Sequence, residues 1–448
     1  MFTKLKLKNF RSFDNIELDL RRRDGESKHL TMIYGENGAG KSNLMSGFVL
    51  LKELMTTMDM RDVYQELLSK DSIFADENME KLMRQQIMLG MRDMKAIIDD
   101  YRMIGNEETI IAEYEFSIYG NSGSYSVEFS KDEIVHERLE YLLSQRRGIY
   151  FDCVPGKIKI NSGIVKDNDF LTDIKAAAKR YWGKHSILAL VLHELYDKSK
   201  SYASNNISEN FDDILAEFSM LSCYIGLGTR KWDGLNAPYE IFEKPTRGQI
   251  PLLEEKQLDI AEFIFTSFFS AINSDIKKAY YKKTYDENKV KYQLYLEKIV
   301  AGENRKIEFS RESTGNHQIV HVLCFLISAC MGCTVIIDEV DAGIHDLLFQ
   351  KVLQEIEPFI EGQVIMTTHN TMLMEAEFAR EATYILSEEE MGHKQIRCVS
   401  AYEKRLYQKN NIRNKYLNNE YEGLPRTTAI DFKALLKRIE DSIEDNNS

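Results

Sequence analysis

The fold is decided by one glycine-rich stretch, Tyr34-Gly35-Glu36-Asn37-Gly38-Ala39-Gly40-Lys41-Ser42-Asn43. An apolar run at residues 30–33 precedes it, and a segment with helical apolar spacing, residues 44–54, follows it. A strand that enters a Gly-x-x-x-x-Gly-Lys-Ser loop and leaves it as a helix is typical of a phosphate-binding site. Glycines let backbone N–H groups approach an anion, and the positive end of the helix dipole faces the same point. The stretch therefore predicts a nucleotide-phosphate site.

The residue types in this loop assign expected roles. Lys41 is expected to reach the β- and γ-phosphates, and the Ser42 hydroxyl to join the Mg2+ shell. An ordinary glycine-rich turn is the competing interpretation, which the flanking strand and helix disfavour. The expected cofactors are ATP and Mg2+. The remaining loop residues expected to contact the nucleotide are Gly35, Glu36, Asn37, Gly38, Ala39, Gly40 and Asn43.

Composition bounds the class of protein. The chain has 448 residues, of which 43% are hydrophobic and 29% charged, so it can bury a large core. A net charge of -13 argues against a surface that is basic all over, as nucleic-acid coats usually are. Local basic patches exist at residues 21–23, 277–278 and 282–283, for which we favour solvated surface. Nucleic-acid binding is therefore possible but not indicated by the net charge.

The location expected from the sequence is cytoplasmic. Six sparse cysteines are typical of an intracellular protein and not of a disulfide framework. The first residues lack the apolar core of a signal peptide. The apolar run at residues 319–337 contains His321 and Ser328, so it favours a buried helix followed by a strand over a membrane span. We expect no membrane partner.

The hydrophobic pattern divides the chain into several regions. Residues 3–20, 109–130 and 149–160 have the alternation of antiparallel strands. Residues 41 to about 104, 168–222 and 252 to about 284 have helical spacing, whereas residues 229–250 are loop-like. The acidic end, residues 440–448, is expected to fray.

A second candidate element is the apolar strand at residues 334–337, which ends in Asp338-Glu339. Ligands bind at the carboxyl ends of strands in α/β sheets. Asp338 is expected to hold Mg2+, and Glu339 to orient and deprotonate the attacking water, because phosphoryl transfer depends on positioning and charge neutralisation. Taken alone, the pair is more often a plain strand end.

Two further segments have the composition of a nucleotide site. Residues 363–368 form an apolar run ending in His369, which can donate to the γ-phosphate region, although a structural histidine is the commoner interpretation. Ser313 and Gly315 precede the apolar helix at residues 317–331 and suit an anion. An ordinary N-cap is the alternative interpretation for Ser313.

Taken in order, these pieces resemble the nucleotide-binding domain of ABC-type ATPases. Within that superfamily the chain is similar to the branch of the SMC, RecF and overcoming-lysogenization-defect (OLD) proteins. Four segments resemble this branch most, namely residues 5–13, the phosphate loop, residues 339–345, and the ending at residues 412–417 and 421–425. The last two resemble stand-alone OLD-like ATPases of bacterial defence loci.

The resemblance implies the fold and a composite site. The implied fold is an α/β ABC-type domain, with a mixed sheet around the phosphate loop and an antiparallel β lobe, interrupted by a largely helical insertion. Ser313 and Gly315 would contact the γ-phosphate held by another subunit, Asp341 would lie across the dimer seam, and Arg11 would join the nucleotide site. No glutamine is assigned as the switch residue, and Gln65, Gln85, Gln86 and Gln145 stay open.

The same resemblance implies the domain boundaries. Residues 1–50 and 300–430 would form the ATPase domain, together with antiparallel strands from about 109–160. Residues 51–108 and 165–290 would form a helical region for partner docking, and residues 431–448 a polar acidic tail.

The function expected is an ATPase that dimerises through ATP and acts as a switch or sensor in prokaryotic, anti-phage defence. It would control a separate effector encoded nearby, and we expect no nuclease domain in this chain. The alternative function is a RecF- or SMC-like repair or recombination ATPase that clamps DNA. DNA-stimulated hydrolysis with a steep salt dependence would favour that alternative.

Overall fold

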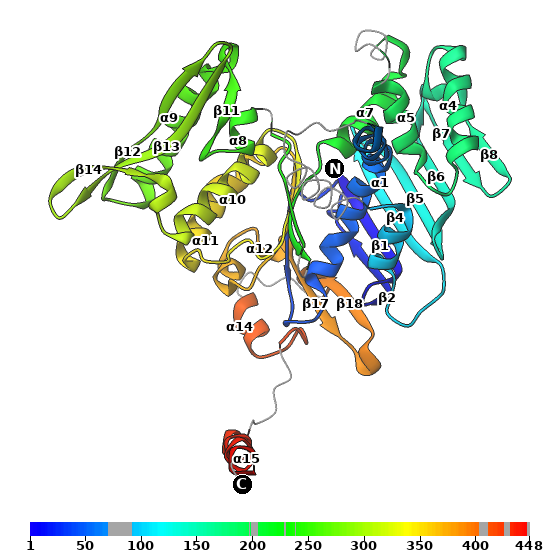
Figure 1. Ribbon diagram of the computed structural model, residues 1–448. Coiled ribbons are helices and arrows are strands. Elements are labelled where there is room, and N and C mark those ends of the chain that lie inside the picture. The colour runs from blue at the N-terminus through cyan, green and yellow to red at the C-terminus, as the bar shows by residue number, and fades with distance from the viewer. Residues whose placement is uncertain are drawn as a thin grey trace.

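The described part of the chain forms three β-sheets and a set of helices that cover them (Figure 1). The computed structural model describes residues 1–69, 92–196, 198, 205–227, 230–237, 239–402, 411–424 and 431–445. The N-terminus starts the first strand of the body, whereas the C-terminal helix α15 (Phe432–Asp445) lies away from it.

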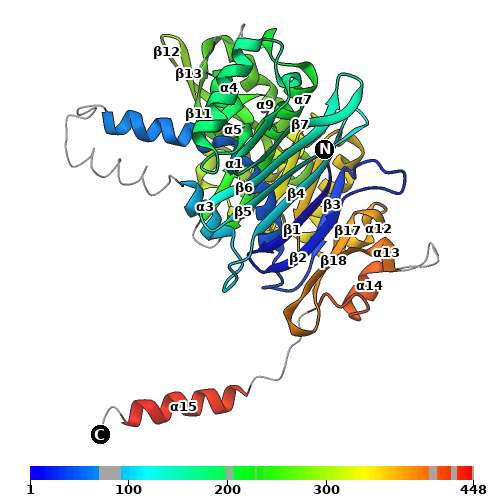
Figure 2. The same cartoon turned by 90° about the vertical axis from the view of Figure 1, so that its right-hand side faces the viewer.

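The first sheet is wholly antiparallel and is named here the antiparallel sheet. Every second side chain along its inner strands is buried, as expected of a sheet with one face on a core. Figure 2 shows this sheet facing the viewer. Its strands in spatial order are β2 (Phe13–Asp19), β1 (Phe2–Phe10), β4 (Ile110–Ile118), β5 (Asn121–Ser130), β6 (Glu133–Leu143), β7 (Arg146–Val154) and β8 (Lys157–Ile160).

The second sheet, named here the core sheet, is parallel in its centre and antiparallel at both edges. Three of its central strands, β3, β15 and β16, are buried at every residue, as expected of strands covered on both faces. The strands in order are β10 (Arg230–Gly234), β9 (Ser222–Leu227), β15 (Thr334–Ile337), β16 (Gln363–Thr367), β3 (Leu30–Tyr34), β17 (Thr383–Glu388) and β18 (Lys394–Cys398).

Helix α1 (Lys41–Ser69) lies between the two sheets, and α10 (Thr314–Cys330) covers the other face of the core sheet (Figure 1). Side-chain alternation explains this layering. Ile33 and Ile336 belong to the hydrophobic cluster that contains α1, whereas Met32 and Val335 belong to the cluster that contains α10. The mixed α/β fold expected from the sequence is confirmed.

The remaining helices surround these layers. Helices α5 (Ile187–Tyr196) and α7 (Glu209–Ser219) contact α1 and bury their apolar faces in the same cluster. The others are α3 (Met94–Tyr101), α4 (Asn168–Tyr181), α11 (Asp346–Ile356), α12 (Ala379–Ala382), α13 (Val399–Tyr402) and α14 (Ile412–Leu417).

A separate lobe, named here the arm, projects beside α10 (Figure 1). Its sheet pairs β13 (Lys289–Val300) with β12 (Ile276–Asp286) on one edge. On its other edge β13 pairs first with β11 (Arg247–Pro251) and then with β14 (Glu303–Glu308). Helix α9 (Lys256–Ile272) packs on one face of this sheet, and the short helix α8 (Glu240–Glu243) precedes β11.

The structure corrects part of the expected secondary structure. Residues 165–290 contain β9, β10, β11 and β12 as well as helices, and residues 276–286 are a strand where helical spacing was expected. Pairing with β13 determines the secondary structure of residues 276–286, because their apolar side chains are buried as part of the sheet. At the acidic end, residues 432–445 form α15 although fraying was expected from residue 440 onward. None of the helices in the described part of the chain is long and apolar enough to cross a membrane.

Candidate functional site

The phosphate loop connects β3 to α1 in a shape that needs its glycines. Gly38 and Gly40 have φ angles of +85° and +105°, in the left-handed region that side chains disfavour. A Cβ on Gly35 would lie 2.6 Å from the backbone oxygen of Leu386, and one on Gly40 would lie 2.8 Å from Ser12 Oγ. The loop therefore packs between β17 and the turn after β1, and larger residues cannot replace these glycines without moving the backbone.

Lys41 begins α1 and bends back over the loop. Its ammonium donates to the carbonyl oxygens of Gly35 at 2.9 Å and Glu36 at 3.2 Å. Burial lowers the pKa of Lys41, while the carboxylates of Asp338 and Glu339 oppose that shift. The lysine is thus held in the loop and lies within the field of the carboxylates at the end of β15.

The ends of β15 and β16 are joined by one hydroxyl. Asp338 is only 6% exposed, and its Oδ1 accepts a hydrogen bond from Thr367 Oγ1 at 2.5 Å. The same Thr367 oxygen accepts from the Glu339 amide at 2.7 Å. Because Thr367 is fully buried, these bonds fix where both acidic residues leave the sheet.

Glu339 directs its carboxylate away from the core. Its φ angle is +48°, a left-handed conformation that is costly for a residue with a side chain and often occurs at functional sites. The residue is exposed, and within the described part of the chain its carboxylate makes no hydrogen bond or ion pair. This carboxylate is free to bind and orient a water molecule.

His369 and Asp341 meet at the same edge. The backbone amide of His369 donates to Asp341 Oδ2 at 3.3 Å. Burial and then the Lys41 ammonium lower the pKa of His369 below its ordinary 6.5, so the ring is mainly neutral at pH 7. A neutral ring can donate one N–H to a phosphate oxygen. The structure therefore brings Lys41, Asp338, Glu339 and His369 into one electrostatic neighbourhood.

Ser313 and Gly315 lie at the start of α10, outside the contacts of the phosphate loop. Ser313 is exposed, and its hydroxyl accepts from the Asn316 amide at 3.2 Å, which is an N-cap. A Cβ on Gly315 would lie 2.7 Å from the backbone oxygen of Gly343, so this segment packs on the loop after β15. Both expected roles remain compatible with the geometry, because the cap uses only one lone pair of the hydroxyl.

The donor set at the loop suits Mg2+ with phosphate oxygens completing its shell. Mg2+ is usually held by one or two carboxylates together with substrate phosphates. Asp338 supplies a carboxylate, and Ser42 supplies a hydroxyl at the first turn of α1. Within the described ranges there is no group of three His, Cys, Asp or Glu side chains that forms a complete metal cage. Asp338 and Ser42 would thus hold the ion only together with the nucleotide.

Arg11 lies beside the loop within a cluster of cations. Its guanidinium is 3.5 Å from Asn43 Oδ1 and 2.9 Å from Asp100 Oδ2. Arg92 and Arg230 also reach Asp100, at 3.1 and 3.2 Å. One carboxylate cannot neutralise three guanidinium groups, although Glu53 also pairs with Arg92. The cluster therefore keeps positive charge next to the phosphate loop.

Several residues of the site carry no signal in the sequence. Thr367 lies in an apolar strand, and Lys394 of β18 donates to the Gly38 carbonyl at 3.1 Å from far along the chain. Asp100 likewise gathers its three arginines only in the folded chain.

The open question of a switch glutamine stays open. Gln85 and Gln86 lie outside the described residues, as does the side chain of Gln65. Gln145 lies in the turn between β6 and β7, separated from β1 by β4 and β5.

Comparison with known families matches residues 4–445 to the AAA domain family AAA_23. The chain belongs to this AAA domain family. No curated protein matches the sequence.

The solved structures similar to this AAA domain include three SMC heads. The SMC head bound to the C-winged helix domain of ScpA is 14% identical, with a TM-score of 0.40, over 88% of this chain and 96% of that one. The SMC head domain from Thermotoga maritima is 15% identical (TM-score 0.36, 89% and 98%). The head with an extended coiled coil bound to the C-terminal domain of ScpA, derived from Pyrococcus furiosus, is 14% identical (TM-score 0.37, 90% and 97%).

Replacing Lys41 by Ala in this AAA domain is expected to abolish ATP binding. The variant lacks the ammonium group at the start of α1 that is expected to bind the β- and γ-phosphates. Titration calorimetry with ATP and Mg2+ measures this directly. Lys394→Ala is the matched control, since it removes a cation of β18 that contacts the Gly38 carbonyl and Glu388, and it should retain binding. Unchanged ATP affinity in Lys41→Ala would exclude the phosphate-loop assignment.

Replacing Thr367 by Val is expected to lower kcat at least tenfold with a smaller change in ATP affinity. The isosteric side chain leaves Asp338 and the Glu339 amide without their buried partner, which costs about 1–3 kcal/mol. Thr367→Ser keeps the hydroxyl and should retain most of the activity. Steady-state phosphate release measures kcat, and equal rates for the Val and Ser variants would contradict a positioning role.

Proposed function

We propose that this AAA domain protein binds and hydrolyses ATP in the cytoplasm and acts as a switch subunit of a prokaryotic, anti-phage defence system. ATP joins two copies of the chain, and the ATP-bound pair controls a separate effector protein. The observation that carries the proposal is the position of the two halves of the site. Lys41, Asp338 and His369 share one edge of the core sheet, whereas the exposed Ser313 caps α10 elsewhere on the same edge.

This separation supports a site completed by a second copy. Gly315 packs on Gly343 of its own chain, and Gly343 follows Asp341 in the loop after β15. Asp341 in turn contacts the His369 backbone. A partner that presents its own Ser313 to the phosphate loop would therefore also touch the loop that holds His369, so nucleotide and interface would be linked.

The defence role is supported by the segments that resemble OLD-like ATPases, because they lie against the site. Tyr416 of α14 packs on Tyr34 of β3, with ring centres 5.8 Å apart. Arg413 pairs with Glu375 and contacts Thr371 just beyond His369. The C-terminal segment thus contacts both the strand before the phosphate loop and the segment after His369. Beyond it, α15 exposes Phe432, Leu435 and Leu436.

Mixing two inactive variants tests whether the site is shared between copies. Lys41→Ala removes the phosphate loop's lysine, and Ser313→Arg blocks the surface at the start of α10. In a two-fold dimer, a mixed pair keeps one intact site, so an equal mixture should recover about a quarter of the wild-type sites. Phosphate release from each variant alone and from the mixture measures this recovery. An inactive mixture would mean that Ser313 acts within its own chain, or not at all.

Glu339→Gln is expected to bind ATP normally, to hydrolyse it at least a hundredfold more slowly, and to accumulate as an oligomer. The amide keeps the shape of the side chain but cannot take a proton from water. Light scattering after size-exclusion chromatography, with ATP or ADP, measures the assembly. Hydrolysis at the wild-type rate would exclude Glu339 as the base.

The same trapped variant tests the defence role. Co-expression with the product of the adjacent gene should yield a complex whose effector activity differs between Glu339→Gln and Lys41→Ala. Phage plating on cells that carry both genes should depend on Lys41. If the neighbour is never retained and plating is unchanged, while duplex DNA stimulates hydrolysis in a salt-dependent manner, the repair function would replace this proposal.

A further inference from the structure

The arm sheet divides the basic residues of its strands between two faces. Side chains alternate along β12, so Lys283 and Tyr285 face α9, and both contact Glu255 there. Lys282 directly precedes Lys283 and so points to the opposite face, where it is exposed. The two lysines of the basic patch at residues 282–283 therefore differ. Lys283 forms an ion pair with α9-side carboxylates, whereas Lys282 is exposed on the other face.

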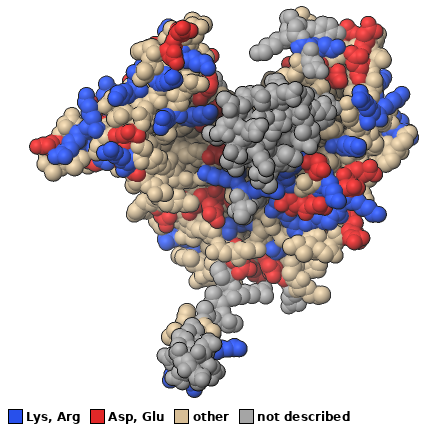
Figure 3. Space-filling view, in the orientation of Figure 1, with Lys and Arg blue, Asp and Glu red and all other residues tan. Residues whose placement is uncertain are grey.

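The face opposite α9, named here the outer face, is basic. The strand registers show which residues lie on this face. They include six cations and three carboxylates. All six cations are exposed, in a chain whose net charge is -13. Figure 3 shows Lys and Arg side chains over the lobe that carries these strands. The cations are Arg247, Lys278, Lys282, Lys289, Lys291 and Lys306, and the carboxylates are Asp286, Glu297 and Glu308.

Only part of this charge is neutralised by neighbours. Lys291 pairs with Asp286 at 3.1 Å, and Lys306 pairs with Glu297 at 3.6 Å. Within the described ranges no ion pair involves Arg247 or Lys282. Cations without carboxylate partners on an exposed strand face attract a polyanion.

Two tyrosines lie side by side on the same face. Tyr280 of β12 and Tyr295 of β13 are directly paired, and their rings stack with centres 5.8 Å apart and planes 29° apart. Both are half-buried, and Lys306 lies 5.7 Å from the Tyr280 ring. Aromatic rings on an open strand face, next to cations, offer a stacking platform for unpaired bases.

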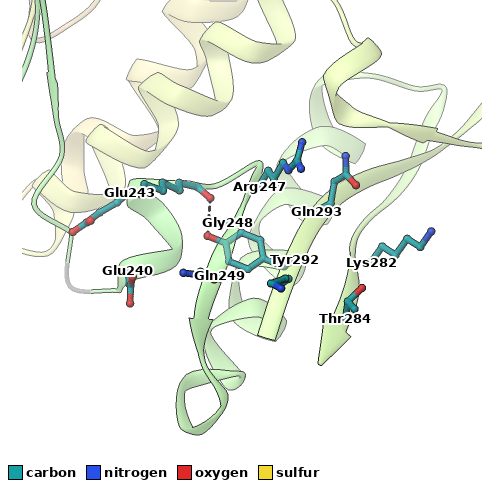
Figure 4. Close-up of a pocket in the computed structure, with 11 residues that line it drawn as sticks. Glu240, Glu243, Arg247, Gly248, Gln249, Lys282, Thr284, Tyr292 and Gln293 are labelled. Carbon is teal, nitrogen blue, oxygen red and sulfur yellow. Dashed lines mark hydrogen bonds between the residues drawn. The ribbon is translucent and has the colours of Figure 1, made fainter. Parts of the chain in front are cut away.

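The outer face continues into a groove next to α8 (Figure 4). The groove has a volume of about 570 Å³ and ends at α8, where Glu240 and Glu243 lie. Arg247, Lys282 and Gln293 come from three neighbouring strands and line it. Gln249 and Thr284 add amide and hydroxyl groups that can donate to or accept from base edges.

We propose that the outer face of the arm binds single-stranded nucleic acid. Tyr280 and Tyr295 stack on bases, while Arg247, Lys282 and Lys291 bind the phosphates. The stacked pair favours a single strand over a duplex, whose bases are already stacked on each other. It also favours nucleic acid over an acidic polypeptide, which would need the cations but not two adjacent rings. The proposal is independent of the ATPase site.

Fluorescence anisotropy with a labelled oligothymidylate and the full chain tests the proposal. Tyr280→Ala with Tyr295→Ala should weaken binding about tenfold or more, because each stacked base contributes strongly to affinity. Tyr285→Ala is the matched control, since that ring is 62% exposed but lies on the α9 side, and it should bind as wild type. An oligouridylate and a DNA duplex are measured in parallel, and the duplex should bind more weakly.

A charge-reversal pair tests the phosphate contacts. Affinity for the oligonucleotide falls as salt rises. Lys282→Glu should make the slope of log affinity against log salt concentration less negative by about 0.7, the value for one phosphate contact on a single strand. Lys256→Glu makes the same charge change at the start of α9, on the other side of the sheet, and should change the slope less. Thermal melting and ATP binding of each variant check that it is folded.

Three results would overturn the proposal. The double tyrosine variant could bind the oligonucleotide as tightly as wild type. The two charge reversals could change the salt dependence equally, which would indicate a general effect of net charge. Polyglutamate could bind as tightly as the oligonucleotide and without regard to the tyrosines, which would assign the face to an acidic protein.

Discussion

The packing of α1 between two sheets fixes the end of the phosphate loop, because the loop leads directly into the first turn of that helix. Gly47 lets the helix approach the antiparallel sheet, since a Cβ there would lie 3.0 Å from Leu7 and 3.1 Å from Leu5. The Tyr114 hydroxyl donates to the Gly47 carbonyl at 2.5 Å, which satisfies the polar groups at this buried contact. The position of Lys41 thus depends on the hydrophobic cluster in which α1 is buried. A change in the packing of α1 would therefore also move Lys41 and the phosphate loop.

The carboxyl edge of the core sheet depends on a second constraint, the burial of a charge. Asp338 is 6% exposed, and a buried carboxylate without partners is strongly unfavourable. Thr367 from the neighbouring strand donates a hydrogen bond to it, and the Lys41 ammonium lies within the field of the same carboxylate. Both partners come from strands or loops that the parallel register brings to the same edge. The residues that stabilise the sheet edge are therefore those that would position the ion and the water.

Much of the fold could be predicted from local sequence, and the reasons are specific. The loop at residues 35–43 and the buried strands around it are set by glycines and apolar runs, which leave few alternatives. The candidate site residues Asp338 and His369 lie on that framework, and both are found from the ends of apolar strands. Thr367, Lys394 and Asp100 could not be found in this way, because each acts through a contact made only by the folded chain. Such contacts join residues far apart in the sequence, and the pairing of distant strands brings these residues together.

The arm shows the same limit most clearly. The consecutive lysines of β12 do not by themselves indicate a helix or a strand. Only the register with β13 shows on which face of the sheet each lysine lies. That register also connects the arm to the start of α10. Lys298 of β13 pairs with Glu312 at 3.0 Å, and Glu312 accepts from Asn316 at 2.8 Å, one turn into α10 beside the cap formed by Ser313. Glu312 is buried against these partners, so β13 cannot shift without disturbing the Ser313 cap. The outer face of the arm is thus connected to the start of α10 through β13 and Glu312.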